Sequence, residues 1–187
     1  MSFDKITVVI NTFHSEDQIN QCLDTVPSDL GVIIVENSNN LNFKNKIEKN
    51  YNNTKCYLTG KNLGYAKGNN YGLAKVKTKF ALILNPDAKL KKDAVKNFLI
   101  SSEKIKDFAI IGPAKQDEFQ KNIEKVTEEN LLLVDNLKGF AMFLNLDELR
   151  EIGFFDENFF IYLEETDLCR RIIKKNKKIY LDKNIHI

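Results

Sequence analysis

Residues 80–88 read FALILNPDA, in which five apolar residues lead directly into Asn85, Pro86 and Asp87. A short apolar run bounded by turn residues is typical of a strand that is buried on both faces of a parallel sheet. Three further runs of this kind occur at residues 6–10, 32–35 and 109–111. Because amphipathic stretches separate the runs, the pattern predicts one α/β domain with a mainly parallel sheet flanked by helices.

The amphipathic stretches predict three helices. The first follows a capping-box pattern at Ser15 and Gln18 and ends at Pro27, and the second begins near Lys91. The third follows an acidic segment near the C-terminus. The side chains predicted to face the core are Ile19, Cys22, Leu23 and Val26 in the first helix, Val95, Phe98 and Leu99 in the second, and Leu168, Ile172 and Ile173 in the third. We expect a mobile or variable loop at 115–130 and a last strand at 178–181.

Composition excludes several classes of protein. The 187 residues include 28 Lys and Arg against 26 Asp and Glu, and this net charge of +2 does not provide the basic surface that nucleic acids require. Three cysteines without a CxxC pair indicate neither a disulfide framework nor a zinc site, which favours a reducing compartment. No signal peptide and no apolar segment of about 20 residues is present, so we expect a cytoplasmic location.

Polar side chains follow three of the predicted strands. In open α/β sheets, ligands bind beyond the carboxyl ends of the strands, where loops vary on a fixed scaffold. Each strand end taken alone is equally compatible with ordinary turn formation by Asn, Asp and Pro. The three ends together predict a binding edge made of Asn11 and Thr12, Glu36 and Asn37, and Asn85 and Asp87.

Residues 154–171, FFDENFFIYLEETDLCRR, combine five carboxylates with five aromatic rings directly before the third predicted helix. Acidic residues in the first turn of a helix and basic residues later on stabilise the helix dipole without any catalytic role. That structural explanation accounts for the charges but not for the aromatic residues. We therefore predict that this segment takes part in chemistry.

Taken in order, five segments resemble motifs of the family 2 glycosyltransferases, which have the GT-A fold and use nucleotide-diphosphate sugars. The segments are VVINTFHS at 8–15, IIVENSNN at 33–40, NLGYAKGNNYG at 62–72, LILNPDA at 82–88 and GFAMFLNLDELREIGFFDENFFIYLEETDLCRR at 139–171. The resemblance covers nearly the whole chain. It implies that residues 1–187 form a single GT-A (Rossmann-like) catalytic domain, without the C-terminal extension of relatives.

The resemblance implies a metal-dependent inverting glycosyltransferase that moves a hexosyl or deoxyhexosyl group to a hydroxyl of a glycan or lipid-linked acceptor. The Gly-Asn-Asn and Asn-Pro-Asp segments are similar to branches that build bacterial surface polysaccharides, including rhamnosyl transfer. Similar enzymes often lean on a membrane, so the resemblance also implies peripheral association with its inner face.

The resemblance assigns the donor nucleotide to the strand ends and to the glycine-rich segment. Glu36 stands where the family usually carries Asp, and Asn69 stands where many relatives carry Arg. Asp87 is the implied ligand of Mg²⁺ or Mn²⁺, with His186 as a further ligand, although a turn at Pro86 and a tail histidine without a role are the alternatives. The implied donor-binding residues are Thr12, Phe13, Glu36, Asn37, Gly64, Lys67, Asn69, Asn70, Asn85 and Asp87.

Alignment with the Glu-Asp-x-Asp motif of the family makes Glu165 the implied general base, with Glu164 as its close rival. The same resemblance places Gly139, Asp156 and Glu157 on the acceptor side. We expect Asp167 to pair with Arg170 or Arg171, three and four residues further along a helix.

Two other functions remain compatible with these residues. A catalytically degenerate nucleotide-sugar-binding domain would explain why Glu replaces Asp at two positions. A sugar-phosphate nucleotidyltransferase shares much of this architecture, but the loop NTFHSEDQ at 11–18 lacks the glycine-rich, basic pattern expected of one.

Overall fold

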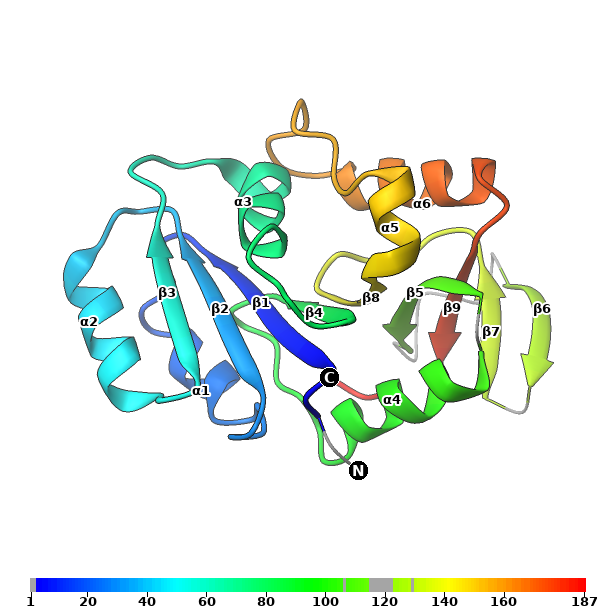
Figure 1. The fold of residues 1–187 in the computed structure, drawn as a ribbon, viewed down its shortest axis with the longest axis horizontal. Helices are drawn as coiled ribbons and strands as arrows, with labels where there is room; N and C mark the ends of the chain where they lie inside the picture. The colour runs from blue at the N-terminus through cyan, green and yellow to red at the C-terminus, as the bar shows by residue number, and fades with distance from the viewer. Residues whose placement is uncertain (1–2, 106, 115–122, 129) are drawn as a thin grey trace.

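The computed structural model describes residues 3–105, 107–114, 123–128 and 130–187. Helices and strands alternate through the first two thirds of the chain, as the apolar runs predict. Figure 1 shows the resulting sheet with helices on both sides of it. The elements are β1 (Ile6–Thr12), α1 (Ile19–Leu23), β2 (Gly31–Glu36), α2 (Leu41–Asn50), β3 (Thr54–Leu58), α3 (Gly64–Leu73), β4 (Phe80–Leu84), α4 (Ala94–Lys104), β5 (Phe108–Pro113), β6 (Ile123–Glu128), β7 (Leu131–Val134), β8 (Ala141–Asn145), α5 (Leu146–Ile152), α6 (Glu164–Lys174) and β9 (Lys178–Asp182).

The strands form one nine-stranded sheet in the order β3-β2-β1-β4-β8-β5-β9-β7-β6. Strands β3, β2, β1 and β4 are parallel neighbours, and β8 lies antiparallel between β4 and β5. The remaining pairings give β7 the same direction as β8, so among the described strands these two run against the other seven. The prediction of a single α/β domain with a mainly parallel sheet flanked by helices is confirmed.

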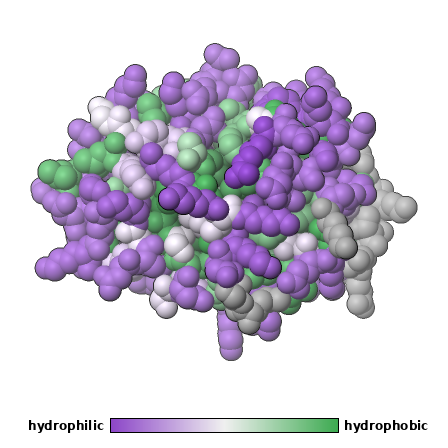
Figure 2. Space-filling view, viewed as in Figure 1, coloured by the Kyte–Doolittle hydropathy of each residue, from purple (hydrophilic) through white to green (hydrophobic). Residues whose placement is uncertain are grey.

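Successive side chains of the central strands point to opposite faces of the sheet and build two apolar layers. Val8 and Ile10 belong to the layer that contains the buried residues of α1, α2 and α4. Val9 belongs to the opposite layer, with residues of α3, α5 and α6. In Figure 2, hydrophilic residues cover most of the visible face, and hydrophobic ones show in its middle and at its left edge. The sheet is therefore buried on both faces, which explains its uninterrupted apolar runs.

The predicted strands are confirmed as β1, β2, β4, β5 and β9, whereas the predicted helices needed correction at their ends. Helix α4 buries Val95, Phe98 and Leu99 as predicted, but it begins at Ala94 rather than near Lys91. The capping box is wrong, because the side chain of Gln18 does not cap α1 and the Ser15 hydroxyl bonds within its own loop. Ile173 was also placed wrongly, since 42% of it is exposed.

The predicted loop at 115–130 is wrong in part, because residues 123–128 form strand β6. This strand pairs antiparallel with β7, whose sequence LLLV carries the apolar run of the hairpin. A polar edge strand next to such a partner has little strand pattern of its own, which explains the error. Residues 115–122 and 129 of the predicted loop lie outside the described residues.

Helix α3 lies close to the sheet because two of its glycines face β1 and β2. A Cβ atom added at Gly68 would lie 2.6 Å from the side chain of Asn11. At Gly72 it would lie 2.6 Å from Cγ1 of Val9 and 3.0 Å from Cγ2 of Val35. Close packing of α3 on the sheet therefore explains why these two positions hold glycine.

We predict that Gly72→Ala lowers the free energy of unfolding by about 1–3 kcal/mol, because overpacking against stiff β-branched neighbours outweighs the better helix propensity of alanine. Urea denaturation measures this change. The matched control is Gly31→Ala, where an added Cβ would have nothing within 4 Å. Equal stability of the two variants would contradict the close packing of α3.

Candidate functional site

A pocket of about 280 Å³ opens at the carboxyl ends of β1, β2 and β4, next to the beginning of α3. The parallel pairing of these three strands brings their ends to one edge of the sheet. Of the residues predicted to bind the donor, those that line this pocket are Thr12, Phe13, Asn37, Gly64, Asn85 and Asp87. The predicted row of polar strand ends is thus brought together in one cavity.

Two asparagines join the strand ends to α3. The Asn37 amide donates a hydrogen bond to Oδ1 of Asn11, and the Asn11 amide donates to the carbonyl of Gly64 at 2.9 Å. The amide N–H of Leu63 donates to Oδ1 of Asn37 at 3.3 Å. Asn11 and Asn37 both line the pocket, so this part of its wall is polar but carries no charge.

The segment after β4 forms a tight turn. The N–H of Ala88 donates to the carbonyl of Asn85 at 3.1 Å, with Pro86 at the second position of the turn, where its fixed φ fits. Asp87 is exposed and forms part of the pocket wall. Burial, reinforced by the charge of Asp87, raises the pKa of the nearby Cys22 thiol to about 12. The turn and the ligand role are therefore compatible, because the turn presents the carboxylate at the pocket.

Glu36 does not line the pocket, in contrast to its predicted role in binding the donor. Its side chain is buried, with Oε1 accepting from the Ser38 N–H at 2.9 Å and from the Ser38 hydroxyl, and Oε2 accepting from the Asn40 N–H at 2.6 Å. Both carboxylate oxygens thus hold the loop that leads into α2. The next residue, Asn37, which was also predicted to bind the donor, does line the pocket.

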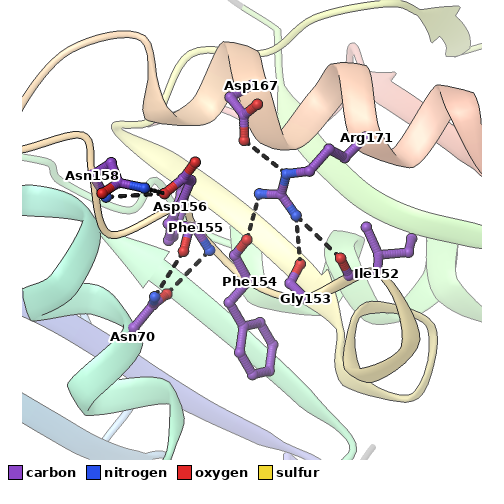
Figure 3. Close-up of polar contacts among 9 residues, drawn as sticks. All are labelled: Asn70, Ile152, Gly153, Phe154, Phe155, Asp156, Asn158, Asp167 and Arg171. Atoms are coloured by element: carbon purple, nitrogen blue, oxygen red, sulfur yellow. Dashed lines mark hydrogen bonds and ion pairs between the residues drawn. The ribbon is translucent and has the colours of Figure 1, made fainter.

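Three further residues predicted to bind the donor, all on α3, also lie outside the pocket wall. The ammonium of Lys67 lies 3.2 Å from Oε2 of Glu157, and the buried Asn69 donates to the carbonyl of Tyr65 at 3.0 Å. Asn70 binds the backbone of Phe155 in both directions, donating to its carbonyl at 2.8 Å and accepting from its N–H at 3.1 Å (Figure 3). In the structure, Lys67 and Asn70 connect α3 to the acidic segment.

Arg171 of α6 holds the beginning of the acidic segment from the side opposite α3 (Figure 3). Its guanidinium donates to the backbone carbonyls of Ile152 at 3.2 Å, Gly153 at 3.0 Å and Phe154. Its Nε donates to Oδ2 of Asp167 at 2.7 Å, which confirms the predicted pairing of Asp167 with an arginine. Asn70 and Arg171 together fix the backbone at 152–155, just before the predicted acceptor-side residues.

Tyr65 links the pocket to the acidic segment, and the sequence analysis missed it. It lines the pocket, and its N–H donates to the carbonyl of Phe160 at 2.7 Å. Its hydroxyl donates to the carbonyl of Gly139. A Cβ atom at Gly139 would lie 3.0 Å from this hydroxyl oxygen and 3.7 Å from Cβ of Glu165. Tyr65, Gly139 and Glu165 therefore meet beside the pocket. The only signal for Tyr65 was its place in the motif at 62–72.

The two candidate bases differ in environment. Glu164 is only 4% exposed, and its Oε2 has no hydrogen-bond partner among the described residues. Burial, followed by the charge of Glu165, raises the pKa of Glu164. Glu165 is half-buried in the first turn of α6. Burial and then the charges of Glu164 and Glu165 raise the pKa of the Tyr65 hydroxyl.

The donor atoms for a cation are few. Within the described ranges, no three His, Cys, Asp or Glu side chains form a group that could hold a metal ion. Asp87 contributes a carboxylate to the pocket wall and Asn85 a carboxamide. The side chain of His186 does not line the pocket, and its backbone carbonyl accepts from the N–H of Lys91 at 3.1 Å. One or two protein oxygens completed by substrate phosphates and water suit Mg²⁺, so Asp87 and Asn85 fit such an ion.

The model of glycosyl transferase family 2 matches residues 7–183. The chain belongs to this family. Among curated proteins, the low-salt glycan biosynthesis hexosyltransferase Agl10 of Haloferax volcanii is 25% identical over 198 residues. The match covers 94% of this chain and 64% of Agl10, so the chain spans less than two thirds of that relative.

Solved structures of low sequence identity share the fold. S. aureus TarS 1–349 has a TM-score of 0.72 at 18% identity, and the match covers 96% of this chain and 58% of that one. The mannosyltransferase PcManGT from Pyrobaculum calidifontis, solved with GDP-Man and Mn²⁺, has a TM-score of 0.79 at 14% identity. This match covers 96% of the present chain and 55% of PcManGT. No helix within the described residues is long and apolar enough to cross a membrane.

We predict that Glu164→Gln changes how stability depends on pH. Because the pKa of Glu164 is raised in the folded chain, the wild type loses stability as the pH rises from about 4.3, the ordinary pKa of a glutamate. Glutamine has no charge to bury. The variant should therefore gain stability relative to the wild type between acidic and neutral pH, which urea denaturation at a series of pH values measures. A stability difference that does not change with pH would contradict this environment for Glu164.

Proposed function

We propose that the protein is an inverting glycosyltransferase that moves a hexosyl or deoxyhexosyl group from a nucleotide-diphosphate sugar to an acceptor hydroxyl. One observation carries the proposal. The pocket at the strand ends lies next to the segment that carries the two carboxylates, because Tyr65 lines the pocket and its N–H binds the carbonyl of Phe160. The loop that lines the pocket with Phe160 and Ile161 then runs directly into Glu164 and Glu165, which lie beyond the pocket wall.

The pocket suits a nucleotide-diphosphate sugar in chemistry and position. Phe13, half exposed, offers a ring to the base, while the amides of Asn11 and Asn37 offer neutral hydrogen-bonding groups. TarS has been solved with UDP-GlcNAc and PcManGT with GDP-Man, which supports this class of donor.

A divalent cation, Mg²⁺ or Mn²⁺, would be held by Asp87 with help from Asn85. When bound, such an ion offsets the negative charge that develops on the diphosphate leaving group. The protein offers little other positive charge at this place, because Lys67 is paired with Glu157 and does not line the pocket. A metal-binding role for His186 stays a prediction.

Glu165 is the proposed general base. Its carboxylate takes the proton from the acceptor hydroxyl as the acceptor oxygen bonds to the anomeric carbon from the face opposite the diphosphate. The bond from that carbon to the diphosphate oxygen breaks at the same time, and its electron pair leaves with the nucleotide. Glu164, which is buried where a charge is disfavoured, is better suited to hold a proton than to take one.

The acceptor side of the site would consist of Gly139, Asp156 and Glu157. Gly139 leaves room beside Tyr65 and Glu165, and Asp156 accepts hydrogen bonds from the N–H and the side chain of Asn158, both at 2.9 Å. We propose a glycan or lipid-linked acceptor and a role in surface glycan synthesis at the cytoplasmic face of a membrane. Agl10 is an archaeal protein of glycan biosynthesis, which supports the glycan but not a specifically bacterial polysaccharide.

We predict that Glu165→Gln lowers turnover by about two to four orders of magnitude while donor affinity stays unchanged, because only proton removal is lost. The measurement is release of nucleoside diphosphate from UDP-GlcNAc, UDP-glucose and GDP-mannose, with nucleotide affinity measured separately. Glu164→Gln is the matched control and should lower turnover much less than Glu165→Gln does. Unchanged turnover in Glu165→Gln would remove this residue from the role, and a wild type that binds donors without turnover would indicate a degenerate binding domain.

We also predict that Asp87→Asn weakens binding of UDP or GDP in the presence of Mn²⁺ by about 100-fold, which removes about 2.7 kcal/mol of ligand stabilisation. Thermal shift with each nucleotide, with Mn²⁺ or with EDTA, measures the effect. Asp156→Asn, which lies outside the pocket wall, is the matched control. Wild-type affinity that persists in EDTA would contradict the metal assignment.

A further inference from the structure

Four consecutive hydrophobic side chains are exposed directly before α6. Phe160, Ile161, Tyr162 and Leu163, here called the apolar strip, are 56%, 52%, 76% and 62% exposed. The other large hydrophobic side chains that are exposed among the described residues, Phe13, Leu41, Tyr71 and Ile173, are not consecutive. Scattered exposed hydrophobic residues are normal, but a contiguous group of them marks an interaction surface.

The backbone of the apolar strip is held in this outward conformation. The carbonyl of Phe160 accepts a hydrogen bond from the N–H of Tyr65, and Gly64 leaves room for it, since an added Cβ there would lie 2.3 Å from that oxygen. Tyr162 and Leu163 adopt φ angles of 71° and 70°, which cost about 1–2 kcal/mol each for residues other than glycine. Figure 1 shows the loop between α5 and α6 rising at the top of the view, above α3.

Positive charges lie on the outer face of the helix that follows. Arg170 and Lys174, one turn apart on α6, are exposed, and neither forms an ion pair with a described residue. Ile173 lies between them and is 42% exposed. Of the three acidic residues of the same helix, Glu164 is buried, Asp167 is paired with Arg171, and Glu165 is half-buried beside Gly139. The apolar strip is thus followed by an unpaired cationic surface.

We propose that the apolar strip enters the headgroup region of an anionic lipid bilayer while Arg170 and Lys174 meet the lipid phosphates. Hydrophobic side chains next to exposed cations are the combination that binds such interfaces. A neutral soluble glycan could stack on the two aromatic rings, but it would leave the exposed aliphatic side chains of Ile161 and Leu163 and the charges of Arg170 and Lys174 without partners of matching chemistry. Two copies of the chain that docked through their apolar strips would bring Arg170 and Lys174 of each copy close together. The repulsion between these charges disfavours a second copy as the partner.

The inference rests on the proposed function in one respect: it names the acceptor as one anchored in lipid. Phe160 and Ile161 line the donor pocket, and Glu165 lies two residues beyond Leu163. A bilayer at the apolar strip would therefore present the headgroup of a lipid-linked acceptor beside the general base. Binding to the bilayer itself requires neither donor nor catalysis, so the two proposals are tested separately.

Co-sedimentation with phosphatidylcholine vesicles, with and without phosphatidylglycerol, tests the inference. We expect the wild type to bind the phosphatidylglycerol vesicles, and Tyr162→Asn with Leu163→Asn to weaken binding by about tenfold or more. Asparagine tolerates positive φ, so this double variant should fold, and its unchanged affinity for UDP or GDP with Mn²⁺ checks that the pocket is intact. The matched control is Leu41→Asn, a side chain 56% exposed on α2, which should bind as the wild type does.

Arg170→Gln with Lys174→Gln should remove the preference for phosphatidylglycerol. The inference is overturned if the wild type binds neither kind of vesicle, or if the asparagine double variant binds as well as the wild type. It is also overturned if the wild type ignores vesicles but forms a dimer that the double variant does not form, because the apolar strip then joins two copies. None of these outcomes depends on turnover, so they leave the test of Glu165 untouched.

Discussion

The close approach of α3 to the sheet is the constraint on which the rest of the site depends. Gly68 and Gly72 let the helix lie against β1 and β2, where a larger residue would meet Asn11, Val9 or Val35 within 3.0 Å. From that position the helix contributes Gly64 and Tyr65 to the donor pocket. The same helix reaches the acidic segment through Tyr65 and Asn70. The donor pocket and the segment that carries Glu164 and Glu165 are therefore neighbours, because α3 contributes to one and is hydrogen-bonded to the other.

The acidic residues of the site have different roles because their surroundings differ. Glu36 is buried with both oxygens hydrogen-bonded, so it organises the loop before α2. Glu164 is buried with an oxygen that has no partner among the described residues, which disfavours its charge. Asp87 is exposed at the pocket, where a cation and a diphosphate can reach it. Burial and hydrogen bonding, rather than residue type, thus separate structural from chemical carboxylates.

Much of the fold could be predicted from the sequence because its central strands are buried on both faces. The runs that became β1, β2, β4 and β5 are uninterrupted, and their polar ends predicted one side of the pocket. Strand β3, TKCYL, was not predicted, because an edge strand with Lys55 exposed carries a weaker pattern. Helix α3 was seen only as a glycine-rich motif, since glycine and asparagine disfavour helices and its stability comes from packing.

The site itself was only partly predictable. Motif order placed Asp87 in a segment that lines the pocket and Glu165 in a segment next to it, but which side chains face the pocket depends on contacts between residues far apart in the chain. Glu36 and Asn69 belong to matching motifs and yet are buried elsewhere, whereas Tyr65 had no separate signal and makes the central contacts. Sequence patterns indicate periodicity and residue chemistry, whereas the direction in which a side chain points depends on tertiary packing.

A crystal structure of the chain with UDP or GDP and Mn²⁺, with the metal located by its anomalous scattering, tests the central claim most directly. We expect the metal peak within coordination distance of the Asp87 carboxylate and the diphosphate in the pocket between Thr12 and Tyr65. The β-phosphate should then face the side on which Glu165 lies. A nucleotide bound away from the strand ends, or a metal peak without Asp87 among its ligands, would contradict the account.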